Sequence, residues 1–393
     1  MAEAPWLTII GLGEDGPAGL CAASRSALAT AEIVIGPPRH LSLIETGARI
    51  IEWPVPFAQG VAEVMALRGR PVVVLASGDP FWFGAGTTLT RDLAPGEWRA
   101  FPGRSTFSLA ASRLGWPLER TLCLGLHAAP LSRLRPHLAP GARMILLLRD
   151  GDAVAALAAY LRETGFGASE VTVMQALGGP RERVTDGSAE TLEGVFAHPV
   201  CVGVEVAGAG AVLPRASGLP DALFDSDGVM TKRPVRALTL SALAPRPGEH
   251  LWDIGGGSGS IGIEWLLSDA SLQATAIEPR ADRIALIEGN ARALGVDRLR
   301  VVKGKAPDAL MDLPRPDAVF IGGGLSEALL AALEPLDTRI VANAVTLESE
   351  ALLVAAQARR GGRLMRVEIS ETVAIGPKRG WKQAFPITQW SFP

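Results

Sequence analysis

The sequence is poor in the side chains that cross-link small domains or bind metal ions. Among 393 residues there are three cysteines and five histidines. Cys21, Cys123 and Cys201 are odd in number and lie outside any C-x-x-C pair, which argues against a disulfide framework and against a cysteine zinc site. The histidines never fall at the spacing of metal ligands. We therefore expect no metal centre.

Long apolar runs and runs of positive charge are missing as well. No stretch of about eighteen apolar residues could form a membrane-spanning helix, and the first residues lack the basic start of a secretion signal. Lys and Arg are spread through a chain of net charge −3, so no basic stripe is available for a phosphate backbone. The sequence predicts a cytoplasmic protein without a nucleic-acid or membrane partner.

The residues that are present predict a globular protein of two or three domains. Hydrophobic residues make up 48% of the chain and charged residues 20%, which is enough to form buried cores. Short Val, Ile and Leu runs alternate with longer Ala- and Leu-rich stretches, a pattern typical of α/β layers with a mostly parallel sheet. Residues 207–220 are small residues and prolines without an amphipathic period, which indicates a linker. We place a first domain at 1–206, a linker at 207–218 and a second domain at 219–393.

Both domains have a recognisable series of expected elements. In the first domain we expect strands at 7–11, 33–35, 72–76, 144–148, 171–176 and 200–206, and helices at 19–30, 87–93 and 153–162. In the second domain we expect a helix at 234–243 and strands at 251–254, 275–278, 299–303, 318–321 and 339–342. A last pair of strands, at 364–374 and 385–389, completes this domain.

A glycine-rich turn follows the first strand of the second domain. Gly255, Gly256, Gly257, Ser258 and Gly259 separate that strand from a helix that begins near residue 260. Glycines let a ligand approach the backbone, and a helix start presents unpaired N–H groups. The sequence therefore predicts one half of a nucleoside pocket at this turn.

An acidic residue ends the next predicted strand and supplies the other half of that pocket. The carboxylate of Glu278 can accept hydrogen bonds from both hydroxyls of a ribose. Two alternatives remain open: a flexible turn beside a surface carboxylate, and a dinucleotide site, because Gly257, Gly259 and Gly262 also satisfy G-x-G-x-x-G.

Further motifs give the second domain a family resemblance. The pattern Asp-x-Gly-x-Gly-x-Gly from Asp253 resembles the first motif of Rossmann-like methyltransferases, which end in an antiparallel hairpin. Together with T-K-R-P-V-R at 231–236, G-K-A-P at 304–307 and N-A-V-T-L-E at 343–348, it resembles the decarboxylating precorrin methyltransferases of cobalamin synthesis over residues 219–393. The resemblance implies a seven-stranded, mostly parallel sheet and an S-adenosylmethionine site lined by Thr231, Gly255, Gly256, Gly257, Ser258, Gly259, Glu278 and Ala306. Thr231 could also cap the helix that follows it.

Three motifs in the first domain occur in an order that resembles the tetrapyrrole methylases. They are I-I-G-L-G-E-D-G at 9–16, S-G-D-P-F-W-F-G at 77–84 and P-G-R-S-T-F at 102–107, and the resemblance covers residues 6–206. It implies two α/β subdomains with the cofactor in the cleft between them. It also implies that Asp79, Trp82, Ser105 and Thr106 contact S-adenosylmethionine and that the loop 11–16 faces the macrocycle.

Two features qualify this assignment within the first domain. Glu14 and Asp15 replace the middle of the commoner Gly-x-Gly-Pro-Gly-Asp form. A simple β-turn is an alternative at 78–80, because Gly, Asp and Pro all favour turns.

The two domains in this order resemble the bifunctional precorrin-6Y (precorrin-6B) C-methyltransferases. That resemblance implies a tetrapyrrole substrate, methylation at macrocycle positions 5 and 15, and loss of carbon dioxide from the acetate side chain at position 12. An NAD-dependent oxidoreductase and a non-catalytic tetrapyrrole carrier or sensor remain as alternatives from other classes. A homo-oligomer also remains open.

Transfer of a methyl group from a sulfonium to a ring carbon needs alignment and exclusion of water more than a nucleophilic side chain. We therefore predict no catalytic base. A substrate with many carboxylates needs fixed cations, although surface charge is the alternative role of each. The candidates near the second cofactor motif and the C-terminal strands are Lys232, Arg233, Arg236, Lys378, Arg379 and Lys382.

Overall fold

The computed structural model describes residues 5–393 and divides the chain into two compact units. The first unit comprises the chain up to Leu131 together with Leu138–Ala211, and the second comprises Ser132–His137 with Val212–Pro393. The change between the units at 211–212 falls inside the predicted linker. Within residues 5–393, no helix is long and apolar enough to cross a membrane.

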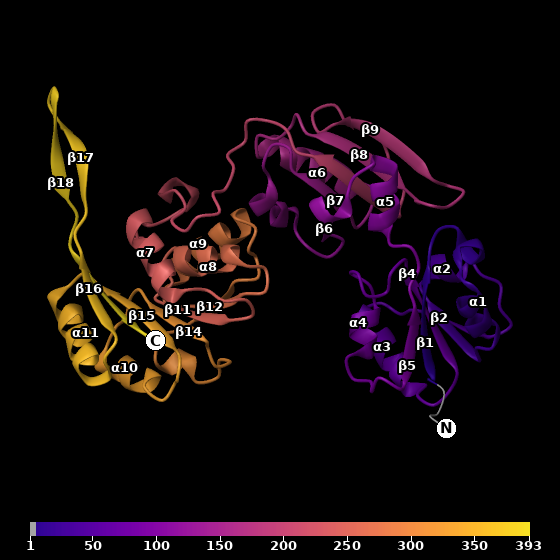
Figure 1. Ribbon diagram of the computed structural model, residues 1–393, viewed down its shortest axis with the longest axis horizontal. Helices are drawn as coiled ribbons and strands as arrows, with labels where there is room; N and C mark the ends of the chain where they lie inside the picture. Colours follow the sequence, from indigo (N-terminus) through magenta and orange to yellow (C-terminus); the bar gives the residue numbers. More distant parts are fainter. Residues whose placement is uncertain (1–4) are drawn as a thin grey trace. The chain divides into compact units, whose positions relative to one another are not determined.

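The first unit begins with a parallel five-stranded sheet (Figure 1). Its strands, in the order β3-β2-β4-β1-β5, are β1 (Leu7–Leu12), β2 (Ile33–Gly36), β3 (Arg49–Glu52), β4 (Val72–Ser77) and β5 (Trp98–Phe101). Apolar side chains from both faces of the central strands form two cores. One core includes α1 (Ala22–Ala29) and α2 (Pro38–Leu41), and the other includes α3 (Phe57–Ala66) and α4 (Gly86–Thr90). Burial on both faces explains why β1 and β4 read as continuous apolar runs.

A second five-stranded sheet completes the first unit. Its strands, in the order β6-β7-β10-β8-β9, are β6 (Leu122–Gly125), β7 (Arg143–Leu147), β8 (Glu170–Gln175), β9 (Arg183–Ser188) and β10 (Val200–Glu205). Only the β6–β7 pair is parallel, and the other three pairs are antiparallel. The helix α5 (Thr106–Leu114) packs on this sheet through Phe107, Ala110 and Ala111, and α6 (Asp152–Glu163) follows β7 in the chain. Two α/β subdomains in the first unit are therefore confirmed.

The second unit contains the predicted seven-stranded, mostly parallel sheet. Its strands, in the order β13-β12-β11-β14-β15-β19-β16, are β11 (His250–Ile254), β12 (Gln273–Glu278), β13 (Arg300–Lys303), β14 (Ala318–Ile321), β15 (Arg339–Ala344), β16 (Arg363–Val367) and β19 (Ile387–Phe392). The first five are parallel, and β19 is antiparallel to both β15 and β16. On one face lie α7 (Arg233–Leu243), α8 (Ser260–Ser268) and α9 (Ala281–Ala293); on the other lie α10 (Glu327–Leu333) and α11 (Leu347–Arg360).

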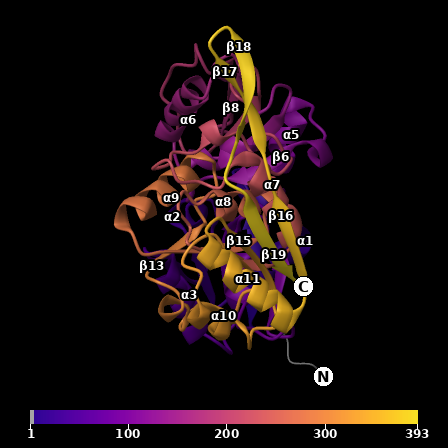
Figure 2. The same cartoon turned by 90° about the vertical axis from the view of Figure 1, so that its left-hand side faces the viewer.

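The predicted strand at 364–374 is wrong as a single element. The structure divides it into β16 and β17 (Ser370–Ile375), and β17 pairs with β18 (Lys378–Gln383), which the sequence did not predict. This β17–β18 hairpin extends from the sheet of the second unit, as the two views show (Figures 1 and 2). Nearly all of its residues are exposed, so it lacks the buried face that gives a strand its usual sequence pattern.

The predicted linker at 207–218 is packed rather than flexible. Gly208 and Gly210 lie directly against Gly165, where an added Cβ at Gly208 would come within 2.5 Å of the Gly165 carbonyl oxygen. Leu213 belongs to the core of the second unit, and Glu264 accepts a hydrogen bond from the backbone N–H of Gly218 at 2.6 Å. The small residues allow backbone segments to approach each other closely here. A flexible linker has a similar composition, so composition alone does not distinguish the two cases.

Candidate active sites of the two units

The three glycine motifs of the first unit meet at the carboxyl ends of adjacent strands. Gly11 is the last residue but one of β1, Gly78 directly follows β4 and Gly103 lies two residues beyond β5. The N–H of Gly103 donates to the carbonyl of Gly78 at 2.9 Å, and a Cβ added at Gly11 would lie 1.8 Å from that same carbonyl oxygen. The three loops therefore contact each other through backbone atoms, and no other residue type fits at Gly11.

All four predicted cofactor residues of the first unit line one cavity of about 260 Å³ beside this junction. These residues are Asp79, Trp82, Ser105 and Thr106. Local geometry explains two of them: Asp79 Oδ1 accepts from the N–H of Phe81 at 2.9 Å, and Ser105 Oγ caps α5 by accepting from the N–H of Ser108 at 3.1 Å. Asp79 therefore begins a turn, in which the N–H of Trp82 donates to the Asp79 carbonyl at 3.3 Å, and Asp79 lines the cavity as well.

A second cavity of about 290 Å³ adjoins the first and is lined by charged residues. Ser77 and Thr106 belong to both cavities, and the predicted macrocycle loop contributes Leu12, Gly13 and Glu14 to the second one. The basic groups on its wall are Arg39, Arg104, Arg149, His127 and His198.

Both unusual acidic residues of this loop are paired with arginine. Glu14 is buried and bridges Arg39 and Arg181, with Arg181 Nη2 2.9 Å from Glu14 Oε2. Asp15 pairs with Arg104. The departure from the commoner family motif therefore creates ion pairs, which proline and glycine could not form.

The glycine turn of the second unit has the shape of a ligand cradle. Gly255, Gly257 and Gly259 have φ of +74°, +59° and +76°. A Cβ at Gly255 would come within 2.7 Å of the N–H nitrogen of Gly323, so this glycine is needed for packing. A Cβ at Gly257 would meet nothing closer than 3.8 Å. Gly257 thus borders open space that a side chain would fill, which fits a bound adenosyl group.

Two buried carboxylates hold this turn in place. Glu278 accepts from the N–H of Gly257 at 3.0 Å and from the N–H of Arg280 at 3.1 Å. Asp253 accepts from the N–H of Gly262 at 2.9 Å. Burial raises the pKa of Asp253 to about 7, the Gly262 N–H opposes this increase, and the nearby charge of Glu278 adds to it.

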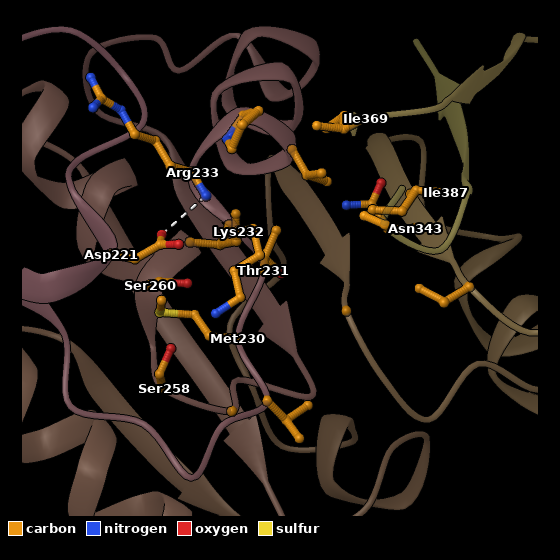
Figure 3. Close-up of a pocket in the computed structure, with 18 of the residues that line it drawn as sticks. Asp221, Met230, Thr231, Lys232, Arg233, Ser258, Ser260, Asn343, Ile369 and Ile387 are labelled. Atoms are coloured by element: carbon orange, nitrogen blue, oxygen red, sulfur yellow. Dashed lines mark hydrogen bonds between the residues drawn. The ribbon is translucent and has the colours of Figure 1, made fainter. Parts of the chain in front are cut away.

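A cavity of about 920 Å³ opens beside the turn (Figure 3). Of the predicted cofactor residues, Thr231, Gly256, Gly257 and Ser258 line it. The other four, Gly255, Gly259, Glu278 and Ala306, are not among the residues on its wall. Met230, Thr231 and Ser258 gather on one side in Figure 3, and Asn343, Ile369 and Ile387 lie on the opposite side. The cavity also reaches the β17–β18 hairpin through Glu371, Val373 and Lys382.

The six predicted cations of the second unit fall into three groups. Lys232, Arg233 and Lys382 line the large cavity. Lys378 and Arg379 are exposed on the β17–β18 hairpin and do not line that cavity. Arg236 is 0% exposed and ion-paired with Glu264, so its assignment to the substrate is corrected. The guanidinium of Arg236 stabilises the folded protein instead of binding a substrate, because its donors already form hydrogen bonds within the protein.

Arg236 and Asn290 fix the two ends of the segment 225–231, part of which lines the cavity. Arg236 Nη1 donates to the carbonyl of Thr231 at 2.6 Å. The amide of Asn290 accepts from the N–H of Asp225 at 2.8 Å and donates to the carbonyl of Ser258 at 2.9 Å. Thr231 itself does not cap α7, since the capping position is Lys232 and makes no side-chain hydrogen bond.

Several cavity residues were absent from the sequence prediction. Arg39 and Asn343 are the clearest cases, and both lie at or just beyond the carboxyl end of a parallel strand. That edge is where ligands bind in open α/β sheets, so the topology could have indicated them once the strands were placed. Among the hairpin residues on the wall, Lys382 was predicted as a cation for the substrate, whereas Glu371 and Val373 offered no such signal.

Comparison with known proteins also divides the chain into two parts. The family of tetrapyrrole (corrin/porphyrin) methylases matches residues 6–193, and the precorrin methyltransferase domain matches residues 222–393. A precorrin-6Y C(5,15)-methyltransferase (decarboxylating) from Sinorhizobium sp. is 52% identical and covers 99% of this chain and 96% of its own. A protein of the same name from Mycobacterium tuberculosis (strain CDC 1551 / Oshkosh) is 40% identical, with 98% and 99% covered. A probable cobalt-precorrin-6B C(15)-methyltransferase (decarboxylating) from Pyrobaculum calidifontis is 38% identical and covers 42% of this chain and 87% of its own.

Proposed function

The chain belongs to the precorrin-6Y C5,15-methyltransferase (decarboxylating) family of cobalamin biosynthesis, and from this premise we propose that its two units divide the reaction between them. The first unit methylates the macrocycle at position 5. The second methylates position 15 and removes carbon dioxide from the acetate at position 12. Membership of this family sets aside the oxidoreductase and the non-catalytic carrier as functions of the chain.

One observation supports the assignment of one methylation to each unit. Residues predicted to bind a cofactor line a cavity in each unit, and the two sets of residues belong to unrelated motifs. The Pyrobaculum relative supports it, because that protein is named only for position 15 and decarboxylation and matches 42% of this chain. Its aligned region has about the length of one unit. The proposal assigns position 5 to the first unit.

The family uses S-adenosylmethionine as its methyl donor, which supplies an electrophilic methyl group in each cavity when bound. In the second unit, Gly257 leaves room for the adenosyl group, and Glu278, at the end of β12, accepts from the N–H of Gly257 and would bind the ribose with its remaining acceptor capacity. In the first unit, Asp79 and Trp82 would contact the cofactor from the loop after β4.

The protein groups bind and orient rather than attack. Cations on the wall of each cavity hold the carboxylates of the precorrin, which aligns the ring carbon with the donor. Lys232, Arg233 and Lys382 have this role in the second unit. The apolar residues Met230 and Ile387 help to exclude water from the same space.

Mass spectrometry of the product after incubation with purified precorrin-6B and S-adenosylmethionine tests the proposal. We expect two added methyl groups and the loss of one carbon dioxide from each substrate molecule. A product that carries the methyl groups but keeps all its carboxylates would remove decarboxylation from this chain. A substrate recovered unchanged would contradict the proposal altogether.

A further inference from the structure

A compact polar network lies in the wall between the two cavities of the first unit. Arg39, His40 and Ser77 form it around the end of β4. Ser77 lines both cavities, His40 lines the predicted cofactor cavity, and Arg39 lines the adjoining charged cavity. The network is therefore in contact with both spaces at once.

Arg39 is the most enclosed arginine of the charged cavity. Its side chain is 26% exposed, compared with 61% for Arg104 and 72% for Arg149. Carboxylate–guanidinium contacts strengthen as water is excluded from them. Among these three residues, Arg39 is thus best placed to hold a carboxylate firmly.

Hydrogen bonds to both terminal nitrogens of the guanidinium fix its orientation. Nη1 pairs with Glu14, and Nη2 donates to Ser77 Oγ and to His40 Nε2, each at 3.0 Å. Three of the five N–H donors of an arginine are used in this way, which leaves the Nε hydrogen and one Nη1 hydrogen for single hydrogen bonds to a ligand. The guanidinium is held in place before any ligand arrives.

His40 can hold Arg39 only as a neutral imidazole, because a guanidinium nitrogen donates and the ring nitrogen must accept. The side chain is 1% exposed. Burial, followed by repulsion from Arg39, lowers the pKa of His40 to about 3. The ring is therefore neutral throughout the neutral pH range, and with the proton on Nδ1 its Nε2 accepts from Arg39.

We propose that Arg39 binds a carboxylate of the macrocyclic substrate in the charged cavity of the first unit, and that His40 is the positioning residue that orients its guanidinium. Glu14, which borders the same cavity, supplies the counter-charge to this group. This inference rests on the proposed function, since it assumes that the first unit methylates a polycarboxylated ring.

Arg181 provides a matched control for the test. It pairs with the same carboxylate, Glu14, but does not line the charged cavity. Arg39→Met and Arg181→Met each leave Glu14 with one arginine, so both remove one ion pair from the same carboxylate, and urea unfolding of both variants accounts for the greater burial of Arg39 (26% exposed, compared with 64% for Arg181). A binding role affects only the first of these two variants.

The experiment measures methylation at position 5 in the full-length chain, with precorrin-6B and a 13C-methyl donor, by NMR of the labelled product. We expect Arg39→Met to raise KM for the macrocycle by about tenfold or more while kcat changes less. Arg181→Met should leave KM within about twofold of the parent value. Arg39→Lys, which keeps the charge but lacks the planar group that Ser77 and His40 orient, should fall between them and serves if Arg39→Met fails to fold.

Two His40 variants test the positioning role. His40→Leu removes the acceptor and should raise KM in the direction of Arg39→Met, whereas His40→Gln can offer a carbonyl oxygen near the Nε2 position and should restore most of the loss. Equal KM values for Arg39→Met and Arg181→Met would overturn the inference about Arg39. Failure of His40→Gln to improve on His40→Leu would overturn the inference about His40. Absence of any label at position 5 with the parent chain would instead count against the proposed function.

Discussion

Asp253 shows how a single buried side chain ties the cofactor turn to the core. It stands in β11 with 1% of its surface exposed, and its carboxyl accepts from the N–H of Gly262 in α8. The same carboxyl borders the large cavity of the second unit. Because burial raises its pKa to about 7 from the usual 3.8, the neutral form is favoured in the fold.

This pKa makes the stability of the second unit depend on pH. The folded protein holds a proton on Asp253 that the unfolded chain releases above about pH 4, so the contribution to stability is complete at low pH and declines up to about pH 7. Asp253→Asn keeps an acceptor for Gly262 and cannot ionise. Between pH 5 and 7 we expect the parent chain to lose stability relative to this variant by roughly 1.4 kcal/mol per pH unit.

Urea unfolding at several pH values measures the difference. Asp312→Asn, at an exposed position, is the control and should follow the parent profile. Parallel curves for Asp253→Asn and the parent chain would show that Asp253 ionises as it does in the unfolded chain.

Glu278 holds the glycine turn and is also expected to bind the ribose. Glu278→Gln retains the volume but loses the charge, so we expect one of the two S-adenosylmethionine sites to weaken by about tenfold to a hundredfold, the value of a charged hydrogen bond of about 1.5–3 kcal/mol. Calorimetric titration of the full chain measures both sites. Glu288→Gln, which is exposed on α9, should leave both isotherms unchanged. Unaltered binding by Glu278→Gln would place the nucleoside elsewhere.

At the scale of whole elements, the backbone contact at the ends of β1, β4 and β5 restricts the residue type at position 11 to glycine. A methyl group at Gly11 would overlap the Gly78 carbonyl, so Gly11→Ala must push two strands apart. We expect a loss of roughly 3 kcal/mol or more in the stability of the first unit, because overpacking against backbone cannot be relieved by a rotamer change.

Gly96→Ala is the matched control, since an added methyl group there meets nothing within 4 Å. Unfolding in urea, followed by circular dichroism, should show Gly96→Ala close to the parent chain. A Gly11→Ala protein as stable as Gly96→Ala would mean that the three loops do not meet as described.

The sequence predicted best those elements whose signal is local. β1, β4 and β14 are apolar runs because both their faces are buried, and the sequence placed them within a residue or two. β3 and β5 were missed, since they have four residues each and are largely exposed or half-buried, which leaves no continuous apolar run. The β17–β18 hairpin was missed for a related reason, because its exposure removes the usual alternation.

The residues of the candidate sites also differ in whether a local sequence signal indicates them. Glycine motifs belong to single loops, and the sequence therefore indicated Gly257 and Asp79 directly. Arg39 and Asn343 acquire their place only when distant segments meet at a sheet edge. Arg236 was wrongly assigned to the substrate because a charge near a motif gives no information on whether the side chain is buried.

At the scale of the whole molecule, the two units should be separable by single substitutions. Gly257→Val fills the open space at the second cofactor turn and forces a branched side chain to φ near +59°. We expect a product with one added methyl group and an intact acetate, or no product if the order of steps is strict. Asp79→Ala disturbs only the first cavity and should still release carbon dioxide.

Mass spectrometry of the product and trapping of labelled carbon dioxide distinguish the two variants. Circular dichroism must show that both are folded. If Asp79→Ala abolished the release of carbon dioxide while Gly257→Val preserved it, the assignment of chemistry to the units would be reversed.

The order of strands around the Gly11 junction also has a consequence for how the chain is made. β1 lies between β4 and β5 in the sheet, yet both partners come later in the sequence, and Phe101 follows Leu12 by 89 residues. At a synthesis rate of about 5–20 residues per second, β1 waits roughly 5–20 s on the ribosome before its second neighbour exists. Throughout that interval an apolar strand has at least one unpaired edge, which is the condition under which nascent chains aggregate. The cavity beside the Gly11 junction therefore cannot form before Phe101 has been made, and its assembly is a step of biosynthesis at which we expect this chain to depend on chaperones.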